Sequence, residues 1–88
     1  MRIKEGFVLR EVAGNNVVIG IGKTMQDFNG VLTLSNSGSL LWKKLENGAT
    51  EDELLNTILD EYDVDTQTAK NDIESFLDKI RSINLLEE

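Results

Sequence analysis

The sequence predicts an α+β domain of the winged-helix kind, in which a three-stranded antiparallel sheet is followed by three helices. Three observations predict this class. Six of the seven glycines fall in residues 1–38, where they separate short apolar runs. Those runs are rich in β-branched residues, which is typical of strands. The remaining sequence is charged and carries leucine at helical spacing, which is typical of amphipathic helices.

The first two strands are expected to form a hairpin. Residues 7–13 alternate in polarity, which places Phe7 and Arg10 on opposite faces of a strand. The cluster Ala13-Gly14-Asn15-Asn16 can adopt the positive φ angles that a tight turn needs. Residues 16–22 follow with four β-branched side chains and complete the predicted hairpin.

A third strand is expected at residues 31–34, Val31-Leu32-Thr33-Leu34. The looser segment 23–29 leads to it, and Asn29-Gly30 is a turn signal directly before it. Short links between strands favour antiparallel pairing. A three-stranded sheet cannot bury a face by itself, so we expect helices to cover one side.

The first predicted helix starts at Asn36 as its N-cap and ends at Asn47-Gly48, where glycine suits the left-handed position after a helix. Its apolar residues are Leu40, Leu41, Trp42 and Leu45. Trp42 is interpreted as a core residue, because a large apolar side chain among leucines usually faces inward.

Two further helices are expected. Thr50 and Glu53 have the spacing of a capping box, which predicts a helix running to about Glu61. Asp65 is the predicted N-cap of a third and longest helix. The inner side of the second helix is expected to hold Leu54, Leu55, Ile58 and Leu59, and that of the third Ala69, Ile73, Phe76, Leu77, Ile80 and Ile83. Leu85 and Leu86 are expected to fold back onto the core.

Composition argues against an enzyme and for a binding module. The 88 residues have the length of one domain, 1–88, and contain no cysteine and no histidine. Thiolate chemistry, the usual general base near neutral pH and the commonest metal ligand are therefore missing. We predict no catalytic residue, no bound metal and no cofactor.

The charge balance disfavours anionic partners. The formal net charge is −7, and residues 36–88 carry thirteen acidic against five basic side chains. Nucleic acids and anionic membrane surfaces both attract Lys and Arg, so neither is an expected partner. No apolar run has the length of a membrane-spanning helix, and the first residues lack the apolar core of a signal peptide. A cytoplasmic location is expected.

Three motif-like fragments have simpler interpretations. Gly20-Ile21-Gly22-Lys23-Thr24 resembles the end of a phosphate loop, but Val17 stands where that loop needs its first glycine. Residues 63–74 imitate part of a calcium loop, but Thr68 replaces the glycine of its sharp turn. The acidic run 51–65 is interpreted as a solvated face, with contact to a basic partner surface as the functional alternative.

The order of several short pieces resembles the PqqD family over nearly the whole chain. The pieces are Phe7-Val8-Leu9-Arg10-Glu11, residues 27–34, Ser37-Gly38 with Leu41-Trp42, Gly48-Ala49-Thr50 before Glu53-Leu54, Tyr62-Asp63-Val64-Asp65, Asp72 with Phe76-Leu77, and Leu85-Leu86. One departure is Asn84, where glycine is expected. Asparagine tolerates the same left-handed backbone.

The resemblance implies a small winged-helix domain that binds the leader segment of a ribosomally made precursor peptide. Such a domain delivers the precursor to a modifying enzyme, which is a radical SAM protein in PQQ biosynthesis. The domain itself does no chemistry. The implied partners are thus a precursor peptide and a radical SAM or other peptide-modifying enzyme.

A peptide can be bound at the edge of the third strand by strand addition. We expect Val31, Leu32, Thr33 and Leu34 to form one wall of a groove, and Ile73 and Leu77 of the longest helix to form the other. Lys70, Glu74 and Arg81 recur at helical spacing with Leu77 and are candidates for selecting charges on the peptide. Only some of the third-strand N–H groups point outward, and the sequence leaves open which. The same edge can pair two copies, so a homodimer also stays open.

A winged-helix DNA-binding regulator is the alternative. In that class the N-terminal residues of the third helix meet bases in the major groove. Residues 66–83 carry three basic and three acidic side chains, and the run before them is acidic. This balance disfavours phosphate contact.

Overall fold

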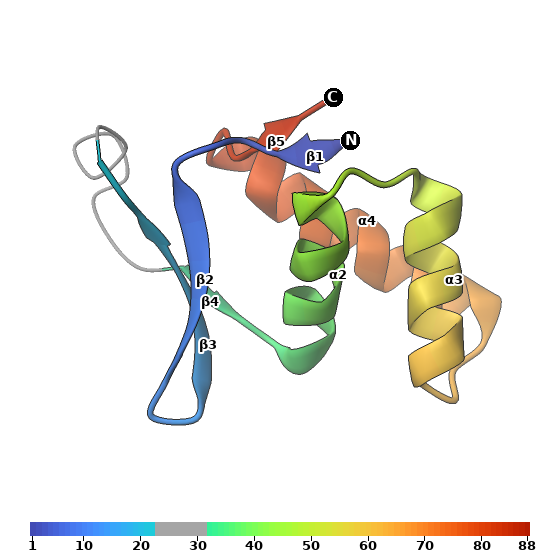
Figure 1. Cartoon of the computed structure of the whole chain (residues 1–88). Coiled ribbons are helices and arrows are strands. Elements are labelled where there is room, and N and C mark those ends of the chain that lie inside the picture. The colour runs from blue at the N-terminus through green and yellow to red at the C-terminus, as the bar shows by residue number, and fades with distance from the viewer. Residues whose placement is uncertain (23–31) are drawn as a thin grey trace.

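The computed structural model describes residues 1–22 and 32–88. In these residues a three-stranded antiparallel sheet is followed by three helices, which confirms the predicted α+β fold. Two short strands at the ends of the chain, which were not predicted, form a second small sheet (Figure 1). The elements are β1 (Arg2–Ile3), β2 (Phe7–Val12), β3 (Asn15–Gly20), β4 (Leu32–Leu34), α2 (Asn36–Glu46), α3 (Glu51–Glu61), α4 (Thr66–Ser82) and β5 (Leu86–Glu87).

The predicted hairpin is confirmed, and its turn is tighter than the sequence suggested. β2 and β3 pair from Phe7 with Gly20 to Val12 with Asn15. Only Ala13 and Gly14 lie between the strands, with φ of 52° and 80°. Two successive positive φ angles match the twist of a two-residue hairpin, so β3 begins at Asn15 rather than after it.

β4 pairs antiparallel with β3, so the sheet order is β2-β3-β4. Leu9 and Leu32 both stand opposite Val18, which places the three side chains in one row on one face. Val18 is fully buried, and the two leucines pack against the core. The predicted third strand thus agrees with the structure at Leu32–Leu34. Val31, the crossing segment 23–29 and the turn at Gly30 lie outside the described residues.

The N-terminus of α2 corrects one prediction. Ser35, not Asn36, is the N-cap, and its hydroxyl accepts a hydrogen bond from the backbone N–H of Gly38 at 3.1 Å. Asn36 is already helical and hydrogen-bonds Asn16 of β3 through its side chain. At the other end, Gly48 has φ of 84°, as predicted for the residue after a helix.

The caps of α3 and α4 are as predicted. Thr50 and Glu53 form a reciprocal capping box, and the Asp65 carboxylate accepts from the N–H of Thr68 at 2.7 Å. The predicted inner stripe of α4 is buried except at its end, where Ile83 is 38% exposed. Ile83 is the C-cap, so the chain leaves the helix there and Asn84 adopts φ of 61°. The left-handed backbone expected at Asn84 is therefore present.

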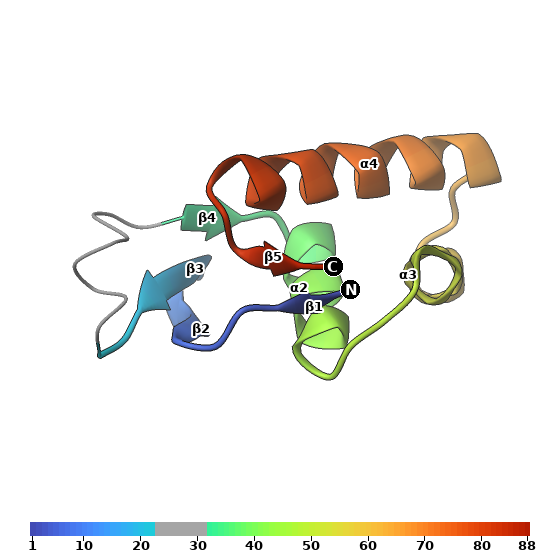
Figure 2. The ribbon, with the colours of Figure 1, turned by 90° about the horizontal axis from the view of Figure 1, so that it is seen from above.

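The helices and the sheet share one core. Figure 1 shows the sheet on one side of α2 and α3 on the other. In Figure 2, α4 runs past α2 from beside α3 to beside β4. Trp42 is fully buried in this core, as predicted, and no described residue accepts a hydrogen bond from its indole N–H. Leu85 and Leu86 are buried too, and β5 pairs with β1, so both ends of the chain lie together. Among the described helices, none is long and apolar enough to cross a membrane.

Candidate functional site: an open strand edge beside the longest helix

The hydrogen-bond pattern of the sheet determines which backbone groups face its open edge. The N–H of Ile21 donates to the carbonyl of Gly6 at 2.8 Å, so these residues form a hydrogen-bonded pair of the β2–β3 ladder. Such pairs recur at every second residue along an antiparallel ladder. Val17 therefore directs its backbone groups toward β2, whereas Asn16 and Val18 direct theirs toward β4.

It follows that Thr33 is the outward-facing residue of β4. Leu34 stands opposite Asn16 and Leu32 opposite Val18, so the backbone groups of both leucines are used within the sheet. Thr33 stands opposite Val17, whose groups point the other way. The N–H and C=O of Thr33 thus point away from β3. Within residues 1–22 and 32–88, no further strand pairs with this edge.

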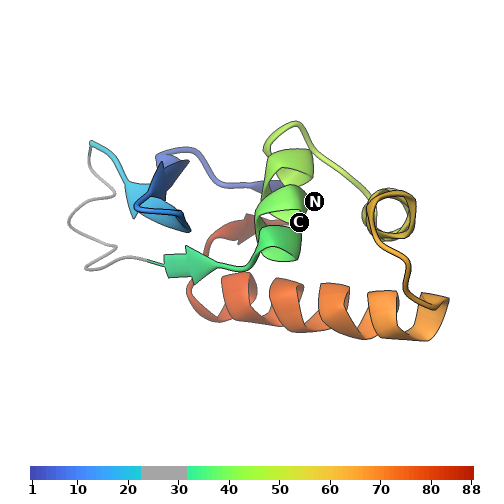
Figure 3. The same cartoon turned by 90° about the horizontal axis from the view of Figure 1, so that it is seen from below.

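The side chain of Lys79 reaches this edge from α4. Its ammonium nitrogen lies 3.5 Å from the carbonyl oxygen of Thr33, which is a long hydrogen bond between the helix and the strand. The contact agrees with an outward-pointing carbonyl. Figures 2 and 3 show β4 lying beside the C-terminal half of α4 in two opposite views.

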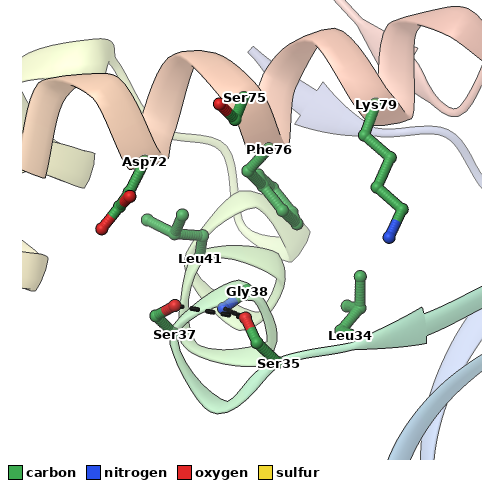
Figure 4. Close-up of a pocket in the computed structure, with 9 residues that line it drawn as sticks. All are labelled: Leu34, Ser35, Ser37, Gly38, Leu41, Asp72, Ser75, Phe76 and Lys79. Carbon is green, nitrogen blue, oxygen red and sulfur yellow. Dashed lines mark hydrogen bonds between the residues drawn. The ribbon is translucent and has the colours of Figure 1, made fainter.

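A cavity of about 260 Å³ lies between α4 and the N-terminal part of α2, and Leu34 at the end of β4 borders it (Figure 4). We call it the β4–α4 groove. Its lining residues are Leu34, Ser35, Ser37, Gly38, Leu41, Asp72, Ser75, Phe76 and Lys79. The Phe76 ring projects into its middle, where Leu34 and Leu41 face it across the groove. The groove therefore has an apolar centre between polar ends.

Gly38 allows α2 to come close to α4 at the floor of this groove. A Cβ atom built on Gly38 would lie 3.2 Å from the Ser35 hydroxyl oxygen and 3.6 Å from Cδ1 of Phe76. The first of these distances is tighter than an ordinary contact. A side chain at position 38 would also project toward Phe76, so glycine here keeps the cavity open.

The two charged residues of the groove lie at its opposite ends. Figure 4 shows Asp72 facing Ser37 at the α2 end and Lys79 facing Leu34 at the β4 end. Both side chains are exposed. Neither has an ion-pair partner among the residues that the structure describes. Their charges are thus available to a bound molecule.

The structure brings only part of the predicted site together. Leu32, Thr33 and Leu34 form the edge strand as expected. On the opposite wall, the predicted residues Ile73 and Leu77 do not line the β4–α4 groove. Leu77 is fully buried in the core, Ile73 lines a separate cavity against α3, and Phe76 lines the groove.

The predicted charge-selecting residues lie elsewhere on α4. Lys70 and Glu74 line, with Ile73, a separate cavity of about 250 Å³ against Leu55 of α3. Arg81 donates to Glu88 at 2.7 Å and also pairs with Asp78 at 3.5 Å. The hydrogen bond from Arg81 lowers the pKa of the Glu88 carboxyl. A role for these residues in peptide binding stays a prediction.

The sequence contained a signal for the groove residues that were missed. Asp72 and Lys79 lie four before and three after Phe76, so they share its face of the helix, and Ser75 borders that face. The sequence-based prediction instead placed Leu77, the next residue along the helix, on the groove wall. Ser37 and Gly38 at the start of α2 belong to the motif that resembles the PqqD family, and the sequence alone does not place them beside Phe76.

The motif-like fragments give no metal site in the described part of the chain. No group of three His, Cys, Asp or Glu side chains there is placed to hold a metal ion. Asp65, one position of the calcium-like pattern, caps α4, and Glu74 lies within that helix. In the phosphate-loop-like fragment, Lys23 and Thr24 lie outside the described residues. The acidic residues 51–53 occupy the first turn of α3, where negative charge is favourable.

These features define a small α+β domain with a strand edge that no other strand of residues 1–22 and 32–88 occupies, beside a groove that has an apolar centre and charged ends. The family model described as coenzyme PQQ synthesis protein D (PqqD) matches residues 7–86. The chain belongs to the PqqD family. Comparison with curated proteins found no match.

Two solved structures are similar over nearly the whole chain. "TbiB1 in Complex with the TbiA(beta) Leader Peptide" is 29% identical with a TM-score of 0.79, over 99% of this chain and 95% of that one. "Lasso peptide synthetase B1 complexed with the leader peptide" is 15% identical with a TM-score of 0.76, over 99% of this chain and 96% of that one. At that identity the second similarity concerns the fold alone.

Proposed function

We propose that residues 1–88 form one non-catalytic domain that binds the leader segment of a ribosomal precursor peptide and presents it to a modifying enzyme. The observation that carries this proposal is the outward-facing backbone of Thr33 beside the β4–α4 groove. An extended peptide can pair with that backbone as a fourth strand. Main-chain hydrogen bonds then supply affinity that does not depend on the peptide sequence.

The groove supplies selectivity. Side chains alternate along an extended peptide, so every second one faces α4. Leu34, Leu41 and Phe76 offer an apolar surface to one such side chain. Leu32, Thr33 and Leu34, together with Phe76 and Lys79, are the residues that we propose contact the peptide.

Comparison with known proteins supports a peptide as the ligand. The chain belongs to the PqqD family, and TbiB1, which is 29% identical to it, was solved in complex with a leader peptide. We further propose a radical SAM enzyme, or another peptide-modifying enzyme, as the second partner. Because ribosomes make the precursor, the encounter belongs in the cytoplasm.

Peptide selection followed by NMR tests the proposal. The full chain is used to select binders from a phage-displayed library of random twelve-residue peptides, and a selected peptide is titrated into isotopically labelled protein. We expect amide signals of residues 32–35 and 72–79 to shift together. Absence of any selected binder, or shifts confined to α3, would contradict the proposal.

Two controls separate the alternatives. A gel shift with duplex DNA at low salt is expected to show no complex, because even weak phosphate binding appears under those conditions. A complex that disappears steeply with added salt would favour the DNA-binding alternative. Analytical ultracentrifugation with and without the selected peptide shows whether two copies pair through the same edge, in which case the peptide dissociates them.

A further inference from the structure

The β4–α4 groove has a fixed electrical polarity along its length. Asp72 and Lys79 are seven residues apart on α4, which corresponds to about 10 Å along the helix axis. Phe76 lies between them, four residues after Asp72 and three before Lys79. One wall of the groove therefore presents, in order, a negative charge, an aromatic ring and a positive charge.

This spacing matches an extended peptide. Side chains on one face of a strand are about 6.7 Å apart, so three successive ones span about 13 Å. A middle side chain seated against Phe76 places the next two near Asp72 and Lys79, within the reach of flexible charged side chains. The recognised unit is thus five peptide residues long, with positions one, three and five facing α4.

The sheet geometry favours an antiparallel peptide. Every pair of neighbouring strands in the described chain is antiparallel. Thr33 offers both its N–H and C=O at one position, and an antiparallel partner residue exchanges both hydrogen bonds with it. β4 runs toward the α2 end of the groove, where Asp72 lies. An antiparallel peptide therefore starts at Asp72 and ends at Lys79.

Lys79 has a second role at this edge. Its ammonium group donates a hydrogen bond to the Thr33 carbonyl, which is also the acceptor that the peptide N–H needs. A lysine at an open edge also discourages unspecific strand pairing. A peptide with an acidic side chain beside Lys79 offers the ammonium group a new partner when the carbonyl is taken. A peptide without an acidic side chain there displaces the Lys79 ammonium group from the Thr33 carbonyl and offers it no new partner.

We propose that this groove selects peptides that read, from N- to C-terminus, basic–x–apolar–x–acidic. In this arrangement Asp72 pairs with the basic residue, Phe76 and Leu34 hold the apolar one, and Lys79 pairs with the acidic one. This proposal rests on the proposed function, because it concerns the selectivity of the same peptide-binding edge.

A charge-exchange variant tests the proposal. Asp72→Lys combined with Lys79→Glu leaves the net charge unchanged and reverses the polarity of the groove. The matched control is Lys43→Glu with Glu46→Lys, which makes the same exchange between two exposed residues of α2 that do not line the groove. Circular dichroism confirms that all proteins are folded before binding is compared.

The probes are a twelve-residue peptide selected on the wild-type chain and its isomer with the two charged residues exchanged. By fluorescence anisotropy, the wild type and the Lys43/Glu46 control are expected to prefer the first peptide about five- to tenfold, as two exposed ion pairs allow. The Asp72/Lys79 variant is expected to prefer the isomer. Raised salt should reduce both preferences.

The outcomes separate this proposal from the proposed function. One outcome is that selected peptides shift the Thr33 amide signal but show no charge order, or the reverse order. That result would overturn the proposed basic–x–apolar–x–acidic selectivity and leave the proposed peptide binding intact. An unchanged preference in the Asp72/Lys79 variant does the same. Failure to select any binding peptide overturns both.

Discussion

Lys79 of α4 and Thr33 of β4 meet across the groove, where the lysine ammonium lies 3.5 Å from the threonine carbonyl oxygen. The contact joins the longest helix to the one position of β4 whose backbone is turned away from the sheet. It places a cation at the mouth of a groove with an apolar centre. Strand edge, helix charge and apolar surface thus converge within one small region.

Proline substitution in β4 distinguishes the outward position from its neighbour. Thr33→Pro removes an N–H that is not used inside the sheet, so we expect stability to change by less than about 1 kcal/mol. Affinity for a selected peptide is expected to fall about fivefold, the value of one hydrogen bond. Leu32→Pro removes an N–H that pairs with Val18, so it should destabilise the fold by about 1–3 kcal/mol.

Thermal denaturation and fluorescence anisotropy of the two variants provide the measurement. Wild-type affinity in a folded Thr33→Pro protein would show that the peptide does not use this edge. Equal destabilisation by the two substitutions would show that the alternation of backbone groups along β4 is misassigned.

The fold was largely predictable because its signals are local. The capping box at Thr50 and the cap at Asp65 lie within three residues of the N–H groups they satisfy, so spacing alone reveals them. The error at Asn36 has the same origin, since Ser35 and Asn36 are both good caps and only the backbone φ and ψ distinguish them. The β1–β5 pair joins opposite ends of the chain, and such short strands carry no periodic signal.

The candidate site was only half predictable. The edge strand could be recognised from its position after the hairpin, and its outward residue followed from the ladder once one hydrogen bond was known. The helix wall required knowing how α4 is rotated relative to β4. Phe76 and Leu77 belong to the same apolar stripe but point in directions about 100° apart, and only the three-dimensional packing puts Phe76 on the strand side.

Gly38→Ala tests whether the groove floor must stay open. Alanine gains about 1 kcal/mol of helix propensity over glycine, and the close contact with the Ser35 hydroxyl offsets part of this gain. We expect the free energy of unfolding to change by less than about 1 kcal/mol. Peptide affinity should fall, because the added methyl group lies 3.6 Å from Cδ1 of Phe76 and narrows the apolar centre.

Calorimetry and peptide titration of the same sample separate the two effects. Undiminished binding by a stable Gly38→Ala protein would show that peptide side chains do not enter the groove at this point. Ser75→Ala, a small change on another wall of the groove, is the matched control and should alter binding less.

The hairpin turn offers a stabilising substitution. Ala13 has φ of 52°, a left-handed conformation that costs an ordinary residue about 1 kcal/mol. Ala13→Asn creates Asn-Gly, the preferred pair for a two-residue hairpin turn, and should raise the free energy of unfolding by about 0.5–1 kcal/mol. Urea denaturation measures the gain. Ala49→Asn is the contrasting control, because that alanine is buried and its replacement should destabilise the fold.

Acidic pH should lower the free energy of unfolding, because carboxylates take part in two helix caps. The hydrogen bond from the Thr68 backbone N–H lowers the pKa of the Asp65 carboxyl, and that from the Thr50 backbone N–H lowers the pKa of the Glu53 carboxyl. A folded pKa below the unfolded one means that protons bind the unfolded chain more tightly. The stabilisation is therefore complete above the ordinary carboxyl pKa values and disappears as pH falls through the lowered ones.

Melting temperatures measured between pH 7 and pH 2 test this linkage. In the variant with Asp65→Asn and Glu53→Gln, polar caps remain but neither group titrates, so its melting temperature should fall less between the two ends of the range than that of the wild type. Asp63→Asn removes an exposed carboxyl from the same acidic run that caps no helix, and it should follow the wild-type curve. If the capping variant and the wild type lose the same number of degrees, the acid sensitivity arises elsewhere in the chain.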